Sequence, residues 1–443
     1  MCQTMDRISY EIKDLVETHR QSCEVFKRKK MLRQIIYNML RMHTEFPIDL
    51  YMVGSSLNGL GTNNSDIDLC LVVDSIGEKM CHLRYAIPVL KWAERILSRL
   101  PFVKNTKLIL AKVPILKFTD SESGIEIDLN FNNIVGIRNT QLIEFYNRMD
   151  KRVQPLVLTA KTWARQNGIN NARNKTISSY TIVLMVIHYL QCGCDPPVLP
   201  CLNKLMPDKF HPDSDITQLS LFEEIPEWQS NNKDSLSRLF IGFLDYFSYK
   251  FDYGNNAICI RTGGTIPKSK AREHVAPKNN PKHWNYICVE EPFDRTNTAK
   301  SVYDEEAFNH ILDVFRQSYA KIMKTQTLSS IILNEPPSFS PMSSYGPTLP
   351  TFTTFDDRFF KVKHGNCNSS SNSSTTSSCN GSTVGGMVSG HSGSINNPQN
   401  HNNPSEYIYH PPNKVHIHDH YSHYLVYPQH TYSSKLLLNL PPF

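Results

Sequence analysis

Two aspartates stand downstream of a glycine-serine pair at a spacing that suits phosphate chemistry. Gly54 and Ser55 follow the apolar run 50–53, and Asp66 and Asp68 lead into the next apolar run. Glycine lets the backbone approach a phosphate closely, and the N–H groups at a helix start attract anions. We therefore predict that Gly54 and Ser55 open a short helix and contact a phosphate group.

Two apolar runs show the alternation of half-buried strands. Asp66 and Asp68 lie two apart in an extended segment, so both carboxylates point from the same face. The run 125–131 alternates in the same way and places Asp128 on the polar face of another strand. Three carboxylates on adjacent strands can hold two Mg²⁺ ions, with Mn²⁺ as an alternative, about 3.5–4 Å apart. The sequence thus predicts a two-metal site for phosphoryl transfer.

Other motifs with similar residues fit this stretch less well. An isolated Asp-x-Asp pair is common in exposed loops, but the glycine-serine pair ahead of it and the acidic strand after it favour a functional site. Gly59-Leu-Gly61 lacks the third glycine of a dinucleotide-binding fingerprint. The stretch 54–57 lacks the Gly-Lys-Ser/Thr of a phosphate-binding P-loop.

The elements that must position these residues follow from periodicity. Residues 1–45 predict one or two amphipathic helices, and we interpret the basic run 27–30 as their solvated face. Residues 46–150 alternate short strands with helical stretches such as 86–97, which is typical of a small α/β unit. From 151 to about 325 helical periodicity dominates.

The remaining chain, 326–443, shifts to Pro, Ser, Thr, Asn, Gly and His. Between 364 and 404 large apolar residues are nearly absent, so no core can form there. We expect a mostly disordered tail. Aromatic residues return at 421–443, where incidental aromatics are favoured over a docking segment for a partner.

Composition limits the class of protein. With 47 Lys and Arg against 41 Asp and Glu, the net charge of +6 suits a polyanionic partner without requiring one. Eleven scattered cysteines without CxxC pairs predict neither a disulfide framework nor a zinc ribbon. Acidic residues near the start argue against a targeting peptide, and the run 180–190 is too short to span a bilayer. We expect no membrane association and a cytoplasmic protein, with nuclear entry left open.

The pattern resembles the DNA polymerase β-like nucleotidyltransferases, and among them the cytoplasmic poly(A) polymerases of the germ-line-development type, which are similar to terminal uridylyltransferases. The resemblance covers about residues 20–325. Its matching segments are 54–55 with 66–68, 128–140, 178–191 and 290–298. It implies an α+β fold: a mixed-sheet catalytic domain at 46–150, a mainly helical central domain at 151–325 packed with helices of 1–45, and the tail at 326–443.

The resemblance also implies an activity, namely template-independent addition of AMP from ATP to RNA 3′ ends with release of pyrophosphate. Asp66, Asp68 and Asp128 would bind the metal ions. Ser55 would contact a phosphate, and Asn139 would hold the ribose of the incoming nucleotide. No DNA template would be needed.

Further nucleotide contacts are implied on two helices. Lys161 and Arg165 are one helical turn apart, so both cations can meet the triphosphate. Ser179 would touch a terminal phosphate, and Tyr180 would stack on the base. Packing of Tyr180 in the core is the alternative interpretation.

Two alternatives to a poly(A) polymerase stay open. In uridylyltransferases resembling this chain a His follows the segment matched by 292–296, whereas here Thr296 runs directly into Asn297. The absence of a histidine at this place leaves room for a purine base, and so favours ATP over UTP. A catalytically silent scaffold is disfavoured because all three aspartates are present. The sequence has neither RNP aromatics nor a KH-type GxxG in a suitable context, so we expect an RNA-binding partner protein to supply RNA specificity.

Overall fold

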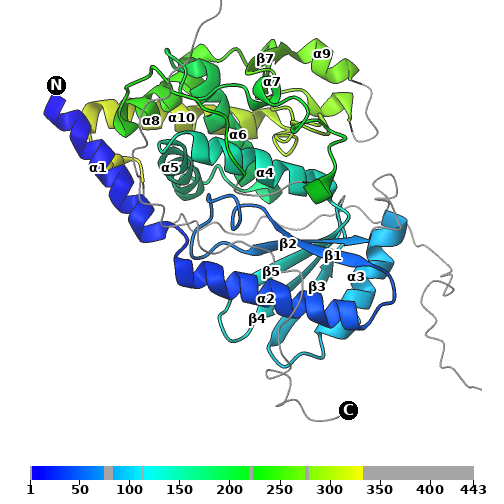
Figure 1. Ribbon diagram of the computed structural model, residues 1–443. Helices are drawn as coiled ribbons and strands as arrows, with labels where there is room; N and C mark the ends of the chain where they lie inside the picture. The colour runs from blue at the N-terminus through cyan, green and yellow to red at the C-terminus, as the bar shows by residue number, and fades with distance from the viewer. Residues whose placement is uncertain (1, 74–82, 112, 219–222, 275–278, 333–443) are drawn as a thin grey trace, which may run out of the picture. The chain divides into compact units, whose positions relative to one another are not determined.

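The first half of the chain forms a mixed sheet covered by helices. The computed structural model describes residues 2–73, 83–111, 113–218, 223–274 and 279–332 (Figure 1). Of the expected tail, only 326–332 falls within these ranges, and the aromatic segment 421–443 lies outside the described residues. The elements of the first half are α1 (Cys2–His19), α2 (Cys23–Met42), β1 (Ile48–Val53), β2 (Ile67–Val73), α3 (Leu83–Leu97), β3 (Val103–Ile109), β4 (Ile115–Asp120), β5 (Glu126–Phe131) and α4 (Ile134–Met149).

The strands are ordered β1-β2-β5-β4-β3. β2 and β5 pair in parallel, whereas β1–β2, β5–β4 and β4–β3 are antiparallel. This register places Asp68 directly opposite Asp128. The predicted α+β class with a mixed sheet is confirmed.

Side chains alternate between the two faces of the sheet along each strand, and this decides where each residue packs. Ile67, Leu69 and Leu71 are fully buried in a core shared with α2 and α3. On the other face Cys70 and Val72 pack with residues of α4. Asp68 shares this second face, because strand residues two apart point the same way. Asp68 therefore points to the α4 face of the sheet, and the α2–α3 face carries the larger sheet core.

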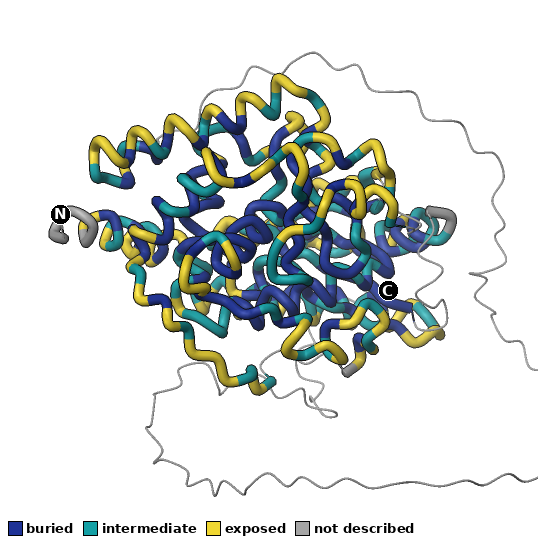
Figure 2. The backbone as a smooth tube through the Cα atoms, turned by 90° about the horizontal axis from the view of Figure 1, so that it is seen from above, coloured by how far each residue is buried: buried dark blue, intermediate teal, exposed yellow. Residues whose placement is uncertain are grey.

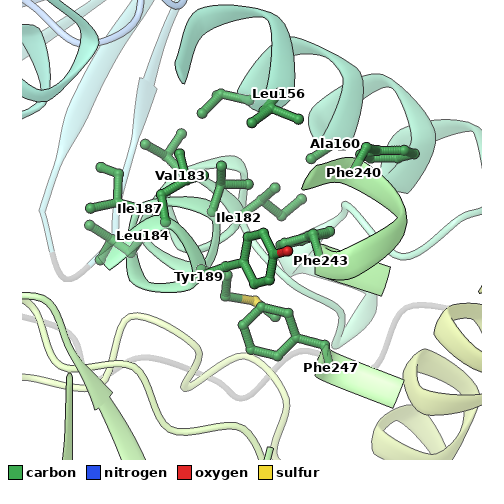
Figure 3. Packing of buried hydrophobic residues seen from close by; sticks show 14 of the residues in the cluster. Leu156, Ala160, Ile182, Val183, Leu184, Ile187, Tyr189, Phe240, Phe243 and Phe247 are labelled. Carbon is green, nitrogen blue, oxygen red and sulfur yellow. The ribbon is translucent and has the colours of Figure 1, made fainter. Parts of the chain in front are cut away.

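The second half of the chain is mainly helical. Its elements are α5 (Val153–Gln166), η3 (Ala172–Asn174), α6 (Ser179–His188), η4 (Tyr189–Gly193), α7 (Leu202–Leu205), η5 (Ile216–Gln218), α8 (Leu236–Asp245), η6 (Tyr246–Lys250), β6 (Asn256–Cys259), β7 (Gly264–Pro267), α9 (Lys268–Glu273), η7 (Pro281–His283), α10 (Glu305–Thr325) and η8 (Leu328–Ser330). Helices α5, α6 and α8 pack around one apolar core, in which Tyr189, Phe243 and Phe247 lie close together (Figure 3). Exposed residues follow the outer faces of the elements, and buried ones gather inside (Figure 2).

Residues 1–45 divide between the two halves. α1 packs on α5 and α8, where Ile8 and Ile12 are fully buried. α2 differs from the expectation for this segment and lies on the sheet, because its stripe of Leu32, Ile36 and Leu40 belongs to the sheet core. Within the described residues, none of the helices combines the length and apolar character that crossing a membrane requires.

The junction between α1 and α2 is bonded to the segment that follows the glycine-serine pair. The backbone N–H of Gln21 donates to the carbonyl oxygen of Gly61 at 3.1 Å. The N–H of Asn63 donates to the carbonyl oxygen of His19 at 3.2 Å. The N-terminal helices are therefore attached by main-chain bonds to the segment just after the turn that carries the candidate phosphate site.

Candidate active site

The three predicted carboxylates lie on two neighbouring strands. Asp68 is in β2 and Asp128 in β5, at paired positions of the parallel ladder, and Asp66 comes just before β2. Neighbouring strands are about 4.8 Å apart, so two carboxylates at paired positions are within reach of a shared ion. The sequence-based prediction that Asp128 joins the other two therefore agrees with the register.

A lysine on β4 contacts this carboxylate cluster. Lys117 is paired across the strands with Asp128. Its Nζ is 3.0 Å from Oδ1 of Asp128, 3.3 Å from Oδ2 of Asp66 and 2.8 Å from Oε2 of Glu126. One cation thus already sits between the carboxylates of Asp66 and Asp128.

The charges of the cluster repel one another. Burial, followed by the negative charges of Asp128 and Asp66, raises the pKa of Asp68 to about 7. Burial also raises the pKa of Asp128, against the opposing effect of Lys117. An oxygen-only donor set with this excess of negative charge is what hard divalent cations such as Mg²⁺ prefer. The donor chemistry of these residues therefore suits a divalent metal ion, although within the described ranges no group of three acidic side chains is placed to hold one while Lys117 stands between them.

Gly54 packs against the cluster at the end of β1. Its φ of +76° is in the left-handed region, and a Cβ added there would stand 2.4 Å from Oδ2 of Asp68. Only glycine fits this position without strain. Residues 54–59 form hydrogen-bonded turns in which the Gly54 carbonyl accepts from the N–H of Leu57 and Asn58, so the predicted short helix at Ser55 is wrong. The left-handed Gly59 ends the turn before a helix can continue.

A buried lysine forms hydrogen bonds with this turn and with the residues next to it. Lys29 of α2 is fully buried, and its Nζ donates to Oε1 of Gln21 at 2.8 Å, Oγ of Ser56 at 2.8 Å and the carbonyl of Ser65 at 2.6 Å. Oγ of Ser56 in turn donates to the carbonyl of Asp66. The interpretation of the run 27–30 as solvated surface is therefore wrong for Lys29. The three oxygen acceptors replace the water that its ammonium group would otherwise need.

The two cations predicted on α5 differ in their surroundings. Lys161 is buried, and its Nζ donates to the carbonyl of Leu60 at 2.9 Å, next to the turn that begins at Gly54. Burial, and then the charge of Arg165, lowers the pKa of Lys161 to about 8. Arg165 is exposed. Helix α5 thus brings one of the two cations into the site interior and leaves the other at its edge.

Ser179 begins α6 at the edge of a cleft of about 540 Å³. The cleft is lined by Asp66, Asn170, Asn171, Ala172, Arg173, Ser178 and Ser179. Oγ of Ser179 donates to Oδ1 of Asn170 at 3.0 Å. Because Asp66 lines the same cleft, the start of α6 faces the carboxylate cluster across a space that can hold a ligand.

Asn139 and Tyr180 meet on the helical side of the site. The hydroxyl of Tyr180 donates to Oδ1 of Asn139 at 2.5 Å, and Nδ2 of Asn139 donates to Oε1 of Glu291 at 2.7 Å. Oε2 of Glu291 accepts the N–H of Phe293 at 2.9 Å. Burial, and then the charge of Asp294, raises the pKa of Glu291 to about 8. Three separate segments of the chain therefore converge on this hydrogen-bonded group.

Three residues of the site were not predicted from the sequence: Lys29, Lys117 and Glu291. Lys29 has a signal in retrospect, since it lies on the same helical stripe as Leu32 and Ile36. Glu291 falls within the segment 290–298 that carried the resemblance. Lys117 has no signal of that kind, because only the pairing of β4 with β5 brings it to Asp128.

Two protein families match the chain. Residues 8–148 match the family described as "Poly(A) RNA polymerase, mitochondrial-like, central palm domain". Residues 235–297 match "Cid1 family poly A polymerase". The first range contains the carboxylate cluster, and the second ends in the segment of Glu291.

Relatives with similar sequences identify the family within these two matches. The human poly(A) RNA polymerase GLD2 is 40% identical over 344 residues, which cover 74% of this chain and 67% of the human protein. The chain belongs to the GLD2 family of poly(A) RNA polymerases. Another GLD2-family member, the Drosophila melanogaster poly(A) RNA polymerase gld-2 homolog A, is 44% identical over 321 residues, 70% of this chain but 23% of the fly protein. The chain thus spans about a quarter of the fly relatives and about two thirds of the vertebrate ones.

A solved GLD2-family structure has the same fold. The GLD-2 chain of the GLD-2/RNP-8 complex is 38% identical and superposes with a TM-score of 0.65. The match covers 74% of this chain and 98% of that chain. The mixed sheet and the helical half are therefore features of the GLD2 family and not of this chain alone.

Proposed function

We propose that the chain is a template-independent poly(A) RNA polymerase that transfers AMP from ATP to RNA 3′ ends and releases pyrophosphate. The observation that carries the proposal is the convergence of Asp66, Asp68 and Asp128 beside the left-handed Gly54. Membership in the GLD2 family supports the same activity. Mg²⁺, or Mn²⁺ in its place, would be held by the three carboxylates, and when bound would favour loss of the RNA 3′ hydroxyl proton and offset charge on pyrophosphate.

The chain's own residues would orient the reactants. Gly54 and Ser55 would lie beside a phosphate, and the missing side chain of Gly54 lets the backbone approach the Asp68 carboxylate closely. Lys161 would contribute a positive charge beside the same turn, with its stem fixed in the interior. Ser179 faces Asp66 across the cleft and would contact the terminal phosphate, and Arg165 would approach it from the edge. Together these groups would position the α-phosphorus for in-line attack.

The base would lie on the helical side of the site. Tyr180 would stack on it, and Asn139 would hold the ribose, with Glu291 fixing the orientation of Asn139. The direct run of Thr296 into Asn297 supports ATP over UTP, since no imidazole is inserted there to meet a pyrimidine. The high pKa of Glu291 supports its acting as a neutral hydrogen-bonding group near pH 7.

The proposed enzyme would have two domains and a tail, and would act with a partner protein. Residues 46–150 would form the catalytic domain, 151–325 the central domain with support from 1–45, and 326–443 a tail that adds no catalytic residue. An RNA-binding protein would bring the RNA, in keeping with the solved complex of the relative GLD-2 with RNP-8. We place this activity in the cytoplasm, where such a complex would meet mature RNA.

Primer extension tests the proposal. The purified full chain would be incubated with an RNA primer, Mg²⁺ and each of the four nucleoside triphosphates in turn. We expect extension with ATP, and no extension by Asp66→Ala combined with Asp68→Ala, because two of the three ligands would be gone. A double variant that removes two exposed carboxylates outside the cluster, Asp14→Ala with Glu45→Ala, should extend normally.

Other outcomes would replace the proposal. Preferred extension with UTP would make the chain a terminal uridylyltransferase. Absence of extension with every nucleotide, in a folded protein that still binds RNA, would make it a silent scaffold. Near-normal extension by the Asp66→Ala, Asp68→Ala variant would refute the metal assignment.

A further inference from the structure

Lys117 places its ammonium group between two carboxylates of the proposed metal site. Its Nζ is within 3.3 Å of oxygen atoms of both Asp66 and Asp128. The side chain of Lys117 is 25% exposed and that of Asp128 is 18% exposed, so the contacts are partly shielded from water. Strand pairing fixes this arrangement, since Lys117 stands directly across the ladder from Asp128.

An ammonium group and a divalent ion cannot both stand between these two carboxylates. A carboxylate can accept a hydrogen bond while it binds a metal ion, but two cations a few ångströms apart repel each other strongly in a partly shielded site. Lys117 must therefore release Asp66 and Asp128 before an ion binds between them.

Glu126 provides a place for the displaced ammonium group. It lies two residues before Asp128 on the same face of β5, and its Oε2 is already 2.8 Å from Nζ of Lys117. The side chain of Glu126 is 52% exposed, farther out than Asp128. A small rotation of the lysine stem would keep this ion pair while opening the inner oxygen atoms.

We propose that Lys117 is a positioning residue whose ammonium group takes the place of a metal ion. It holds Asp66 and Asp128 together when no metal is bound, and it moves to Glu126 when a metal ion binds. The inference rests on the proposed function, since it takes the carboxylates as the metal site. Its consequence is that Lys117 competes with the metal. A lysine with a purely structural role would instead support metal binding.

Metal binding without nucleotide or RNA tests the competition. Mn²⁺ would be titrated into the full chain, with free ion measured from its paramagnetic resonance signal, and Mg²⁺ would be followed by the shift of the thermal unfolding midpoint. For Lys117→Met we expect metal affinity to rise by about tenfold, because two partly exposed ion pairs no longer have to be broken. The metal-free variant should unfold at a lower temperature, because the carboxylates lose their cation.

A matched control separates competition from loss of charge. Lys107 on β3 stands across from Lys117 in the ladder and is exposed. Lys107→Met removes the same charge from an exposed side chain, so we expect it to change metal affinity by less than about twofold. Lys117→Gln provides a second, polar replacement if the methionine variant folds poorly.

Glu126→Gln gives an independent test. In the unsubstituted chain it should weaken metal binding, because Lys117 loses its alternative partner. In the Lys117→Met background the same change should have a much smaller effect, a coupling that a double-mutant cycle measures. Equal effects in both backgrounds would mean that Glu126 acts only through its charge, and the exchange would be refuted.

The remaining outcomes are also decisive. Metal affinity that is unchanged or weaker in both Lys117 variants would overturn the inference, while primer extension by the unsubstituted chain would keep the proposed function intact. Absence of Mn²⁺ binding to the unsubstituted chain would overturn the inference together with the metal assignment.

Discussion

Lys29 carries its amino group in a fully buried position beneath the turn that begins at Gly54. Burial lowers its pKa to about 8, and the negative charges of Asp66 and Asp68 oppose that shift. A buried lysine is tolerated where each of its protons finds an acceptor. Lys29 meets that condition with one glutamine, one serine hydroxyl and one carbonyl.

Replacement of Lys29 by methionine should loosen this turn. We expect Lys29→Met to lower the free energy of unfolding by about 1–3 kcal/mol, since three buried acceptors lose their donor. The KM for ATP should rise more than kcat falls. Chemical denaturation and ATP titrations would measure both effects, with Lys27→Met, an exposed lysine of the same helix, as the control. A stability equal to that of the control would mean that the three bonds contribute nothing.

Asp68 should make the stability of the metal-free protein depend on pH. Its pKa is raised to about 7 in the folded chain from an ordinary value of 3.8. Between these values the folded state binds more protons than the unfolded state, so stability falls as pH rises from about 4 to about 7. The loss is complete above pH 7, where the buried carboxylate is charged.

Asp68→Asn removes that charge. At pH 8 in a chelator, we expect the variant to be more stable than the unsubstituted chain by on the order of 2 kcal/mol, about half of what the pKa difference alone gives, since coupled carboxylates share protons. Near pH 4 the difference should vanish. Thermal unfolding over this pH range would test it, with Asp14→Asn as an exposed control. A gain at pH 4 equal to that at pH 8 would contradict the titration of Asp68.

The carboxylates could be predicted from the sequence because local alternation fixes the face of each one. Ile67 and Leu69 had to be buried, so Asp68 had to point away from them. Lys117 could not be predicted, since its role depends on a ladder between strands and not on its neighbours in the chain. Lys29 was misassigned because charged residues are rarely fully buried.

The segment 290–297 is joined to helices α4 and α6 through Glu291. Replacing Glu291 by alanine would remove the acceptor of Asn139 and of the Phe293 N–H. We expect Glu291→Ala to lower the free energy of unfolding by about 1–3 kcal/mol and to raise the KM for ATP, because Asn139 loses its fixed orientation.

Glu291→Gln is the matched control for this link. The amide has nearly the shape of a protonated carboxyl group, which is the form that a pKa of about 8 favours at pH 7. Because the amide keeps only one of the two accepting oxygen atoms, stability and KM at pH 7 should lie between those of the alanine variant and those of the unsubstituted chain. If glutamine were as damaging as alanine, the carboxylate charge and not the hydrogen-bond link would be the important feature.

Strands β3 and β4 were not predicted, in contrast to β1, β2 and β5. β3 is an edge strand with lysines at 104 and 107 and a register irregularity between them, so its alternation is weak. β4 alternates in burial, but its polar positions are long or hydroxylated side chains that also suit loops. β1, β2 and β5 were predictable because buried apolar residues make up half or more of each strand.

The packed chain continues past α10 to Ile332. Leu328, Ile331 and Ile332 are buried in the helical core, and the carbonyl of Ile331 accepts from Nδ2 of Asn167 at 2.9 Å. The N–H of Leu328 donates to the carboxylate of Glu11 in α1. These contacts attach the end of the described chain to its first helix.

Two truncations should therefore behave differently. A chain ending at 332 should keep its stability and extend a primer, since no residue of the site is removed. A chain ending at 325 should lose on the order of 4 kcal/mol, because three buried apolar side chains are missing. Thermal unfolding of both would measure the difference. Equal stabilities would mean that the η8 segment is not held in solution, and loss of all extension at 332 would assign a catalytic role to the tail.

The α+β arrangement followed from the change in periodicity at about residue 150, where strands give way to helices. The division of α1 and α2 between the two halves did not follow, since both helices show the same amphipathic spacing. Which apolar stripe meets which core is decided by long-range packing.

The bonds from His19 and Gln21 to the segment 61–63 give the first helix an influence beyond its own packing. A binding protein that pulled on α1, or a fusion that strained it, would transmit that force to the segment that follows the turn at Gly54. Turnover could then be changed from α1 without a contact to any of the three aspartates.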